Sequence, residues 1–236
     1  MKSARAVHAA DSALSAEAAF PRLLDRFDAP ASDEAVARTA QALQRRGFVV
    51  RVFEKPAEAV EFIDGHIKDG ETVSMGGSTT LSQLGVIDAL KRREAAVTNF
   101  KALALEARAK GDLAGFAAIS AKGASADWFM SSVSAVTEDG VLHAADFSGS
   151  RISGWLAAKR LFLVLGTNKI VPDEEAAEHR LVEYQLPLES ARLRATTTFK
   201  SSTIANRIQM VHPGAAFAAG APSRVTVIIV KGAWGF

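Results

Sequence analysis

The sequence predicts an α/β fold with a mostly parallel sheet that carries helices on both faces. Segments whose apolar residues repeat at helical spacing alternate with short apolar runs, which is typical of strands joined by crossover helices. The run "RLFLVLG" at residues 160–166 is almost continuously apolar, as in a strand buried on both faces. No Pro-rich or Ser-rich linker interrupts residues 32–236. We therefore expect one domain there, preceded by an N-terminal helical appendage at residues 1–31.

The first helix and strand of this domain are marked at both ends. Ser32 can cap a helix, Val36 and Leu43 fall on one of its faces, and Gly47 ends it. Residues 48–53 are rich in apolar and β-branched side chains and are predicted to form the first strand.

The same unit is expected twice more before residue 101. Pro56 opens a second helix, which stops at Gly70 and leads into a strand at residues 72–74. After the glycines of "SMGGSTT", residues 81–93 carry a broad apolar stripe typical of a helix, and residues 95–100 are the next short strand.

The remaining elements are predicted from composition and turn residues. The alanine-rich residues 101–129 are expected to be helical, with breaks at Gly111, Gly115 and Gly123. Asp139-Gly140 suits a tight hairpin between two strands within residues 130–146. The later elements are a helix at 152–158, the strand at 160–166, a helix from Pro172 to about Leu186, a turn-rich stretch and a last strand at 223–230.

Composition excludes several classes of function. Lys and Arg number 28 against 26 Asp and Glu, so the net charge of +2 gives no basic field for nucleic acid. The chain has no cysteine, which excludes disulfides, thiol catalysis and iron–sulfur clusters bound by the chain itself. It also has no apolar stretch of about 18 residues and no leucine-rich signal, so we expect a cytoplasmic protein without a membrane span.

Most signatures of enzymes are missing as well. The sequence has no nucleophile elbow, no Walker loop, no dinucleotide-binding glycine fingerprint and no zinc-protease motif. The five histidines are far apart and lack the spacing of metal ligands; they are His8, His66, His143, His179 and His212. We therefore expect no metal and no resident cofactor.

The segment "SMGGSTT" is the strongest candidate for a binding site. A strand that ends at Gly76 and Gly77 and passes through Ser78 and Thr79 into a helix directs backbone N–H groups and hydroxyls at one point. Such a loop favours a phosphate, a carboxylate or a pyrophosphate. The alternative is that the glycines only make the turn and a hydroxyl only caps the helix.

Three further segments have both a functional and a structural interpretation. Glu138 is a candidate catalytic carboxylate, or the solvated shoulder of the hairpin. Arg151 begins a helix, where its guanidinium can hold an anion or pair with Asp146. Asn168 and Lys169 directly follow the strand at 160–166, at the carboxyl end where open α/β sheets bind ligands.

The combination of "GGSTTLSQLG", "SSVSAVTEDGVLHAADFSGSRIS", "LVLGTNKIVPDEEAAEHR" and "VTVIIVKGAWGF" resembles the LUD-domain proteins, the lactate-utilisation family with LutC- and YkgG-type members. The resemblance covers residues 35–236 in order. It implies the NagB/RpiA/CoA-transferase-like fold shared by sugar-phosphate isomerases and coenzyme A transferases, in which a glycine- and hydroxyl-rich loop binds phosphate. It thus favours the ligand interpretation of the "GGSTT" loop.

The resemblance also bears on catalysis and on cysteine. "Glu138-Asp139-Gly140" is similar in form to the segment that supplies the nucleophilic glutamate of coenzyme A transferases, whereas no acidic motif of the isomerases is present. Relatives often carry a cysteine cluster before the last strand, and here "TTTFKSSTIANRIQM" has none. In lactate-utilisation systems the iron–sulfur clusters belong to partner proteins, so the chain resembles the cluster-free component.

Three functions follow as hypotheses. The first is an anion-binding or accessory subunit that supports oxidation of L-lactate to pyruvate together with iron–sulfur partner proteins. Its ligand is expected to be a small anion such as a phosphate, a carboxylate or a coenzyme A-like molecule. The second is a free-standing coenzyme A transferase or thioesterase with Glu138 as nucleophile. The third is a non-catalytic interaction module whose glycine loop is empty. The sequence leaves open whether the protein is an enzyme.

Overall fold

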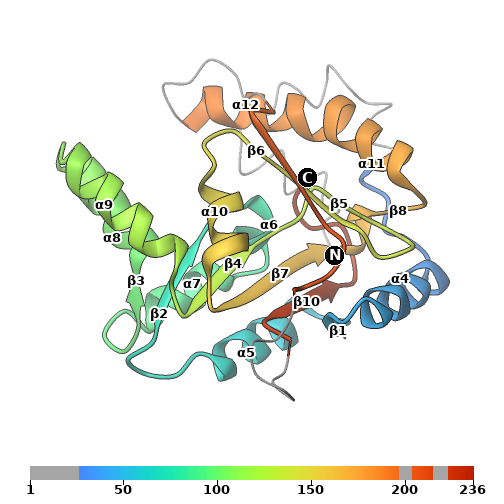
Figure 1. Cartoon of the computed structure of the whole chain (residues 1–236), viewed down its shortest axis with the longest axis horizontal. Coiled ribbons are helices and arrows are strands. Elements are labelled where there is room, and N and C mark those ends of the chain that lie inside the picture. Colours follow the sequence, from blue (N-terminus) through green and yellow to red (C-terminus); the bar gives the residue numbers. More distant parts are fainter. Residues whose placement is uncertain (1–26, 197–203, 215–222) are drawn as a thin grey trace.

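The structure, a computed structural model, describes residues 27–196, 204–214 and 223–236, so most of the expected N-terminal appendage lies outside the described residues. A six-stranded, wholly parallel sheet forms the centre (Figure 1). Its strands in spatial order are β1 (Val49–Phe53), β10 (Val225–Val230), β7 (Arg160–Gly166), β4 (Trp128–Ser131), β2 (Thr72–Met75) and β3 (Thr98–Asn99). The predicted α/β class is confirmed.

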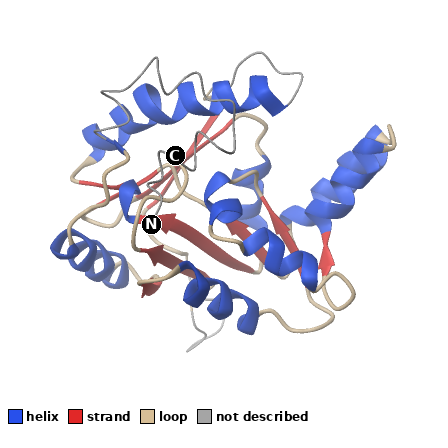
Figure 2. Cartoon of the chain, turned by 180° about the vertical axis from the view of Figure 1, so that it is seen from behind, coloured by secondary structure: helices blue, strands red, loops and turns tan. Residues whose placement is uncertain are grey.

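Helices cover both faces of this main sheet, as Figure 2 shows from behind. One face carries α5 (Pro56–His66), α6 (Thr79–Gln83) and α7 (Val86–Arg92), and the other carries α4 (Asp33–Arg45), α10 (Ser150–Ala157) and a second sheet. Strand β7 alternates between the two cores: Leu161 and Leu163 pack on the α4 side, whereas Phe162 and Val164 pack on the α5 side. Burial on both faces explains its continuous apolar sequence.

The second sheet is mixed and holds the predicted hairpin. Its strands in order are β8 (Ile170–Val171), β5 (Ala135–Thr137), β6 (Leu142–Asp146) and β9 (Asn206–Met210). Strands β5 and β6 are antiparallel, and their turn closes with a 2.8 Å hydrogen bond from Gly140 N to Thr137 O. Gly140 has a φ of +89°, a conformation that glycine adopts without strain.

The two expected helices in residues 81–129 need correction. The apolar stripe after the glycine loop is divided by Gly85, whose φ of +86° ends α6 and begins α7. In the alanine-rich stretch the helix breaks only at Gly111, between α8 (Phe100–Ala109) and α9 (Leu113–Ala124). Gly115 and Gly123 lie within α9, and Gly123 allows close packing because a Cβ there would lie 2.6 Å from Ser74 Oγ.

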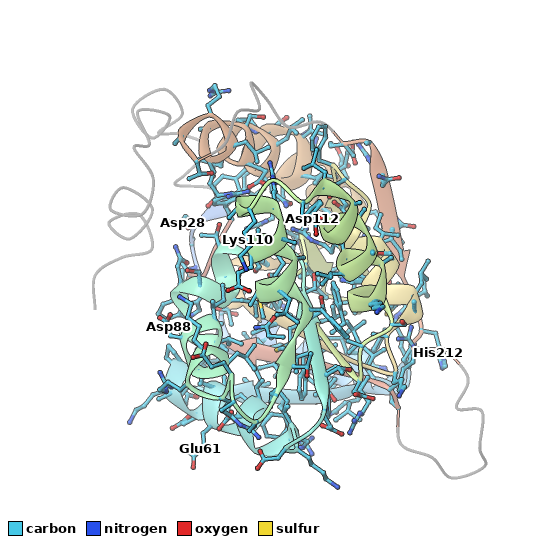
Figure 3. The ribbon with its side chains drawn as sticks, turned by 90° about the vertical axis from the view of Figure 1, so that its left-hand side faces the viewer. Asp28, Glu61, Asp88, Lys110, Asp112 and His212 are labelled. Atoms are coloured by element: carbon cyan, nitrogen blue, oxygen red, sulfur yellow. The ribbon has the colours of Figure 1, made fainter. Side chains whose placement is uncertain are left out.

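Helices α8 and α9 form a hairpin that projects from the body (Figure 1). Figure 3 faces this hairpin, and its labelled Lys110 and Asp112 mark the turn. The alanine-rich pattern also hid a strand, because β4 begins at Trp128, a position assigned from sequence to the helical stretch.

The first part of the stretch predicted to be turn-rich after Leu186, residues 187–196, is helical instead. Helix α11 (Glu174–His179) continues through a π-helical segment, η2 (Arg180–Gln185), into α12 (Leu186–Thr196), and β9 follows. Pro187 lacks an N–H group and its ring would clash with the carbonyl of Glu183 in a regular helix. The wider π-helical turn ahead of Pro187 accommodates this residue, and so the helix does not end there.

Candidate functional site

The carboxyl ends of the main strands bring four loops together. Because the strands are parallel, their following segments leave from the same edge. These segments are the loop after β2 with the start of α6 (residues 76–80), the loop after β4 (132–134), the 3₁₀ turn η1 after β7 (Thr167–Lys169) and the segment after β10 (231–236). Ligands of open α/β sheets bind at this edge. Hydrogen bonds between these loops define the candidate site.

Lys169 lies at the centre of this site and is only 1% exposed. Its Nζ donates to Thr80 Oγ1 (3.0 Å), to Ser132 Oγ (3.0 Å), to Val133 O (3.1 Å) and to Phe236 O (3.0 Å). An ammonium group has three protons, so four oxygens exceed what it can satisfy at one time. None of the four oxygens belongs to an Asp or Glu side chain.

Arg180 is the second buried cation of the site, with no exposed surface. Its Nη1 donates to Ser134 O, its Nε donates to Asn168 O at 3.3 Å, and its guanidinium lies 5.0 Å from the centre of the Tyr184 ring. Its Nη2 is buried and has no hydrogen-bond partner among the described residues. An unpaired buried donor of this kind is costly unless something outside the chain satisfies it.

The two cations act on each other electrostatically. Burial lowers the pKa of Lys169 well below its ordinary value, and the charges of Arg180 and Arg151 lower it further. Burial lowers the pKa of Arg180 to about 10. Across the described residues, neither Lys169 nor Arg180 forms an ion pair with an Asp or Glu side chain, although the charge of Asp28 acts on Arg180 and favours its protonated form. Buried charges in proteins are normally paired, so this arrangement suits an anion from outside the chain.

The glycine loop contributes to the site mainly through Thr80. Ser78 caps α6 by accepting a hydrogen bond from Leu81 N at 3.2 Å, as the structural interpretation of the sequence expected. The Thr79 side chain makes no hydrogen bond with the described residues. Because α6 has only five residues, its dipole gives less attraction for an anion than the predicted long helix would.

Arg151 contacts the glycine loop directly. Its Nη2 donates to Gly77 O at 3.1 Å and its Nη1 donates to Ala145 O at 3.0 Å, while Nε has no partner in the described parts of the chain. A Cβ on Gly76 would lie 3.5 Å from Arg151 Cβ. The carboxylate of Asp146 accepts backbone N–H groups at the start of α10 instead of pairing with the guanidinium.

Asn168 turns both ends of its amide toward the segment after β10. Its Oδ1 accepts from Trp234 N at 3.2 Å, and its Nδ2 donates to Gly235 O at 3.0 Å. The side chain is buried. Asn168 therefore joins the end of β7 to the loop that covers the site.

Glu138 has different neighbours. Its carboxylate accepts from Arg38 Nε of α4 at 2.8 Å, and its backbone N donates to Val171 O at 2.9 Å. Within the described residues it has no hydrogen bond or ion pair to the glycine loop or to Lys169. Its role as a nucleophile stays a prediction.

The structure thus brings part of the predicted set together. Gly76, Gly77 and Arg151 are in contact, and Lys169 joins them through Thr80. Sequence reasoning missed Ser132 and Arg180. The sequence did contain an indication that Arg180 is buried. Arg180 lies three residues after Ala177 and four before Tyr184, which places it on the apolar face of its helix.

The rest of the described chain was searched for other binding sites, metal sites and membrane spans. An open groove of about 810 Å³ lies between α5 and α7, where Glu61 and Asp88 are on the outer surface (Figure 3). The charged side chains of this groove include Asp64 and Arg93, which form an ion pair with each other. Residues 27–196, 204–214 and 223–236 contain no cluster of three potential metal ligands. None of the helices they form is long and apolar enough to cross a membrane.

Comparisons with known proteins identify the family. The crystal structure of a DUF162 family protein from Deinococcus radiodurans matches with a TM-score of 0.51 and 12% identity, and it covers 85% of this chain and 99% of that chain. At this identity the match shows the fold alone. Ribose 5-phosphate isomerase A from Neisseria gonorrhoeae matches 58% of this chain and 56% of that chain at 14% identity. Its TM-score of 0.30 is too low to show that the two folds are the same.

A search of curated proteins finds no match. The family model of the LUD domain, a domain linked to lactate utilisation, matches residues 36–230. This match covers most of the chain and includes every residue of the site except the segment after β10. The chain therefore belongs to the LUD-domain family.

Proposed function

We propose that the chain is an anion-binding accessory protein of LutC type that supports oxidation of L-lactate to pyruvate together with iron–sulfur partner proteins. The link between the LUD domain and lactate utilisation supports the broad role. The absence of cysteine from the chain means that thiolate-bound clusters would have to belong to partners. In this proposal the chain binds the substrate or product anion, and electron transfer takes place in the partners.

One observation carries the proposal: Lys169 and Arg180 are both buried in the site, and neither forms an ion pair with an Asp or Glu side chain of the described residues. A small carboxylate would supply the missing negative charge and could accept a hydrogen bond from Arg180 Nη2. Thr80 and Ser132 place hydroxyl groups beside Lys169, where they could bond to the hydroxyl or keto oxygen of a 2-hydroxy or 2-oxo acid.

Calorimetric titration with L-lactate, pyruvate and inorganic phosphate tests the anion site. Arg180→Lys keeps the positive charge but removes Nη2, so we expect binding of the preferred anion to weaken about tenfold, the loss of one charge-assisted hydrogen bond. Arg160→Lys is the matched control, because Arg160 pairs with Glu71 at the opposite edge of the sheet. Equal binding by the wild type and Arg180→Lys would contradict this assignment.

The partner role needs a test in cells. A strain that lacks the chain should grow poorly on L-lactate, and the wild-type chain should restore growth while Arg180→Lys restores it less. The tagged chain should also co-purify with the iron–sulfur subunits of the lactate-oxidising system. Normal growth of the deletion strain, with no such association, would exclude the accessory role and favour the interaction module.

A further inference from the structure

The π-helical segment η2 supplies two buried polar groups that have no partner among the described residues. It joins α11 to α12 in the continuous helix along one side of the molecule (Figure 1). Arg180 Nη2, a donor, lies at its start, and Gln185 Oε1, an acceptor, lies at its end. The two residues are 0% and 9% exposed. Buried polar groups are normally hydrogen-bonded, so a molecule from outside the chain is expected to complete this pair.

The geometry of the π-helix places the two groups on one face. Its backbone hydrogen bonds join residues five apart, as from Leu186 N to Leu181 O, so Gln185 lies one turn beyond Arg180. Tyr184 belongs to the same turn, and its ring centre lies 5.0 Å from Arg180 Cζ. Val182 lies on the outer face and is 41% exposed. Arg180 and Gln185 therefore line the same buried region.

Arg180 and Gln185 do not satisfy each other. The other nitrogens of Arg180 donate to Ser134 O and to Asn168 O, which fixes the guanidinium beside η1. Nη2 keeps two protons, and the amide oxygen of Gln185 keeps two lone pairs. A ligand that satisfies both residues therefore carries an acceptor next to a donor.

A 2-hydroxy acid has this combination, because its carboxylate accepts hydrogen bonds and the neighbouring hydroxyl donates one. The carboxylate of L-lactate can accept from Arg180 Nη2 while its hydroxyl donates to Gln185 Oε1. A hydroxyl also accepts, so this bond is compatible with the contact to Thr80 or Ser132 proposed above. The keto oxygen of pyruvate cannot donate, and with pyruvate bound the amide oxygen stays buried and unpaired.

We propose that Gln185 is a specificity residue of the site, which selects a 2-hydroxy acid over the corresponding 2-oxo acid by accepting the hydroxyl hydrogen. This inference rests on the function proposed above and names the form of the ligand that the chain holds. A site with a buried polar group that only one ligand satisfies discriminates against the other ligand. The chain accordingly holds L-lactate and releases pyruvate once the partners have oxidised it.

Gln185→Met provides the test, because methionine has a similar length and volume but lacks the amide oxygen. We expect the wild type to bind L-lactate about tenfold more tightly than pyruvate in calorimetric titration, the value of one hydrogen bond to a buried acceptor. In Gln185→Met the two affinities should become equal, through weaker binding of L-lactate. A merely structural role would weaken both anions by the same factor, so the ratio of the two affinities is the decisive measurement.

Gln185→Glu is the second test, and it decides the question if Gln185→Met does not fold. The new carboxylate should pair with Arg180 and take the place of the ligand. We expect the affinity for both anions to fall about 100-fold or more. The melting temperature should stay at or above that of the wild type, because the buried cation gains a partner. Val182→Met and Val182→Glu are the matched controls, since they place the same side chains on the outer face of the same segment, and they should leave both affinities unchanged.

The outcomes separate this inference from the proposed function. The inference is wrong, and the anion site stands, if Gln185→Met keeps the wild-type ratio of affinities or if Gln185→Glu binds L-lactate as the wild type does. A wild type that binds pyruvate as tightly as L-lactate overturns it as well. If the wild type binds neither anion, the proposed function fails, and the inference fails with it.

Discussion

The two ends of the main sheet differ in whether their charged side chains have partners of opposite charge. At the amino end, each carboxylate beside the strands has a cation partner: Glu71 pairs with Arg160, and Asp127 pairs with Lys159 at 2.8 Å. At the carboxyl end, Lys169 and Arg180 are more deeply buried, and neither forms an ion pair with an Asp or Glu side chain of the described residues. The difference separates a region that stabilises the fold from one that is suited to a ligand.

The amino end is satisfied within the chain. Trp128 Nε1 donates to Glu71 at 2.8 Å, the guanidinium of Arg160 lies 4.2 Å from the centre of the Trp128 ring, and that ring stacks on Phe162 at 4.4 Å. Burial raises the pKa of Glu71, but the hydrogen bonds to its carboxylate outweigh this and leave the pKa below its ordinary value. No ligand is needed to complete this arrangement.

Lys169→Met should have the largest effect, because it removes the centre of the carboxyl-end site. We expect anion affinity to fall about 100-fold or more, since a charge that contacts the ligand is lost. The free energy of unfolding should also fall, by about 2 kcal/mol, as four oxygens lose a donor. Calorimetric titration and urea unfolding measure the two effects.

The matched control for Lys169→Met is Lys159→Met at the amino end. Lys159 is largely exposed and pairs with Asp127, so its loss should leave anion affinity unchanged. If both variants reduce affinity equally, the distinction between the two ends is wrong.

Asp127→Asn should lower stability without affecting the ligand site. The Asp127 carboxylate accepts hydrogen bonds from Lys159 Nζ, from Thr72 Oγ1 (2.7 Å) and from Thr72 N (2.9 Å), which hold the pKa of Asp127 well below its ordinary value. We expect a loss of about 1–2 kcal/mol at pH 7. Because the folded-state pKa is depressed, the contribution is complete above the unfolded pKa of about 4 and is lost as the pH falls below it.

Urea unfolding of the wild type and Asp127→Asn between pH 7 and pH 3 measures this effect. The difference in unfolding free energy between the two proteins should begin to shrink below about pH 4, and only part of it should be lost at pH 3, because the folded-state pKa of Asp127 lies lower still. A difference that stays constant with pH would show that the carboxylate charge does not matter.

The pH dependence of Lys169 should have the same sign as that of Asp127 but should occur at neutral to alkaline pH. Burial holds the pKa of Lys169 below that of an unfolded lysine, about 10.4, so the unfolded chain binds more protons between the two values. The stability of the wild type relative to Lys169→Met should therefore rise as the pH increases from 7 toward 10. Parallel stability curves for the two proteins over this range would contradict the lowered pKa.

Sequence patterns within a few residues correctly predicted those helix ends and strands that depend only on neighbouring residues. Ser32 caps α4 because its hydroxyl accepts from Ala35 N three residues on, and the continuous apolar run of β7 reports burial on both faces. The position of Asn168 and Lys169 at a carboxyl strand end followed from the same strand. These features depend on spacing along the chain, which a sequence displays directly.

The rest of the site depends on contacts between distant residues. Lys169 meets Thr80 across 89 positions and Phe236 across 67, and no local pattern records such pairs. The pairing of β6 with β9, such as Leu142 with Met210, was missed for the same reason. The contacts of residues 233–236 were missed because the glycines there are typical of a loop, and because backbone groups of Trp234 and Gly235 bond to the distant residues Asn168 and Gln83.

Glu138→Gln should have the smallest effect, and it decides whether the hairpin carboxylate belongs to the chemistry of the carboxyl end. Glu138 forms an ion pair with the exposed side chain of Arg38, where solvent screens the charges, so its loss should change stability little. Glu178→Gln is the matched control, because Glu178 pairs with Arg207 in a similarly exposed position. We expect both variants to bind the anion and to restore growth on L-lactate as the wild type does. A loss of either property in Glu138→Gln alone would assign Glu138 to the active chemistry and favour the coenzyme A transferase hypothesis over an accessory role.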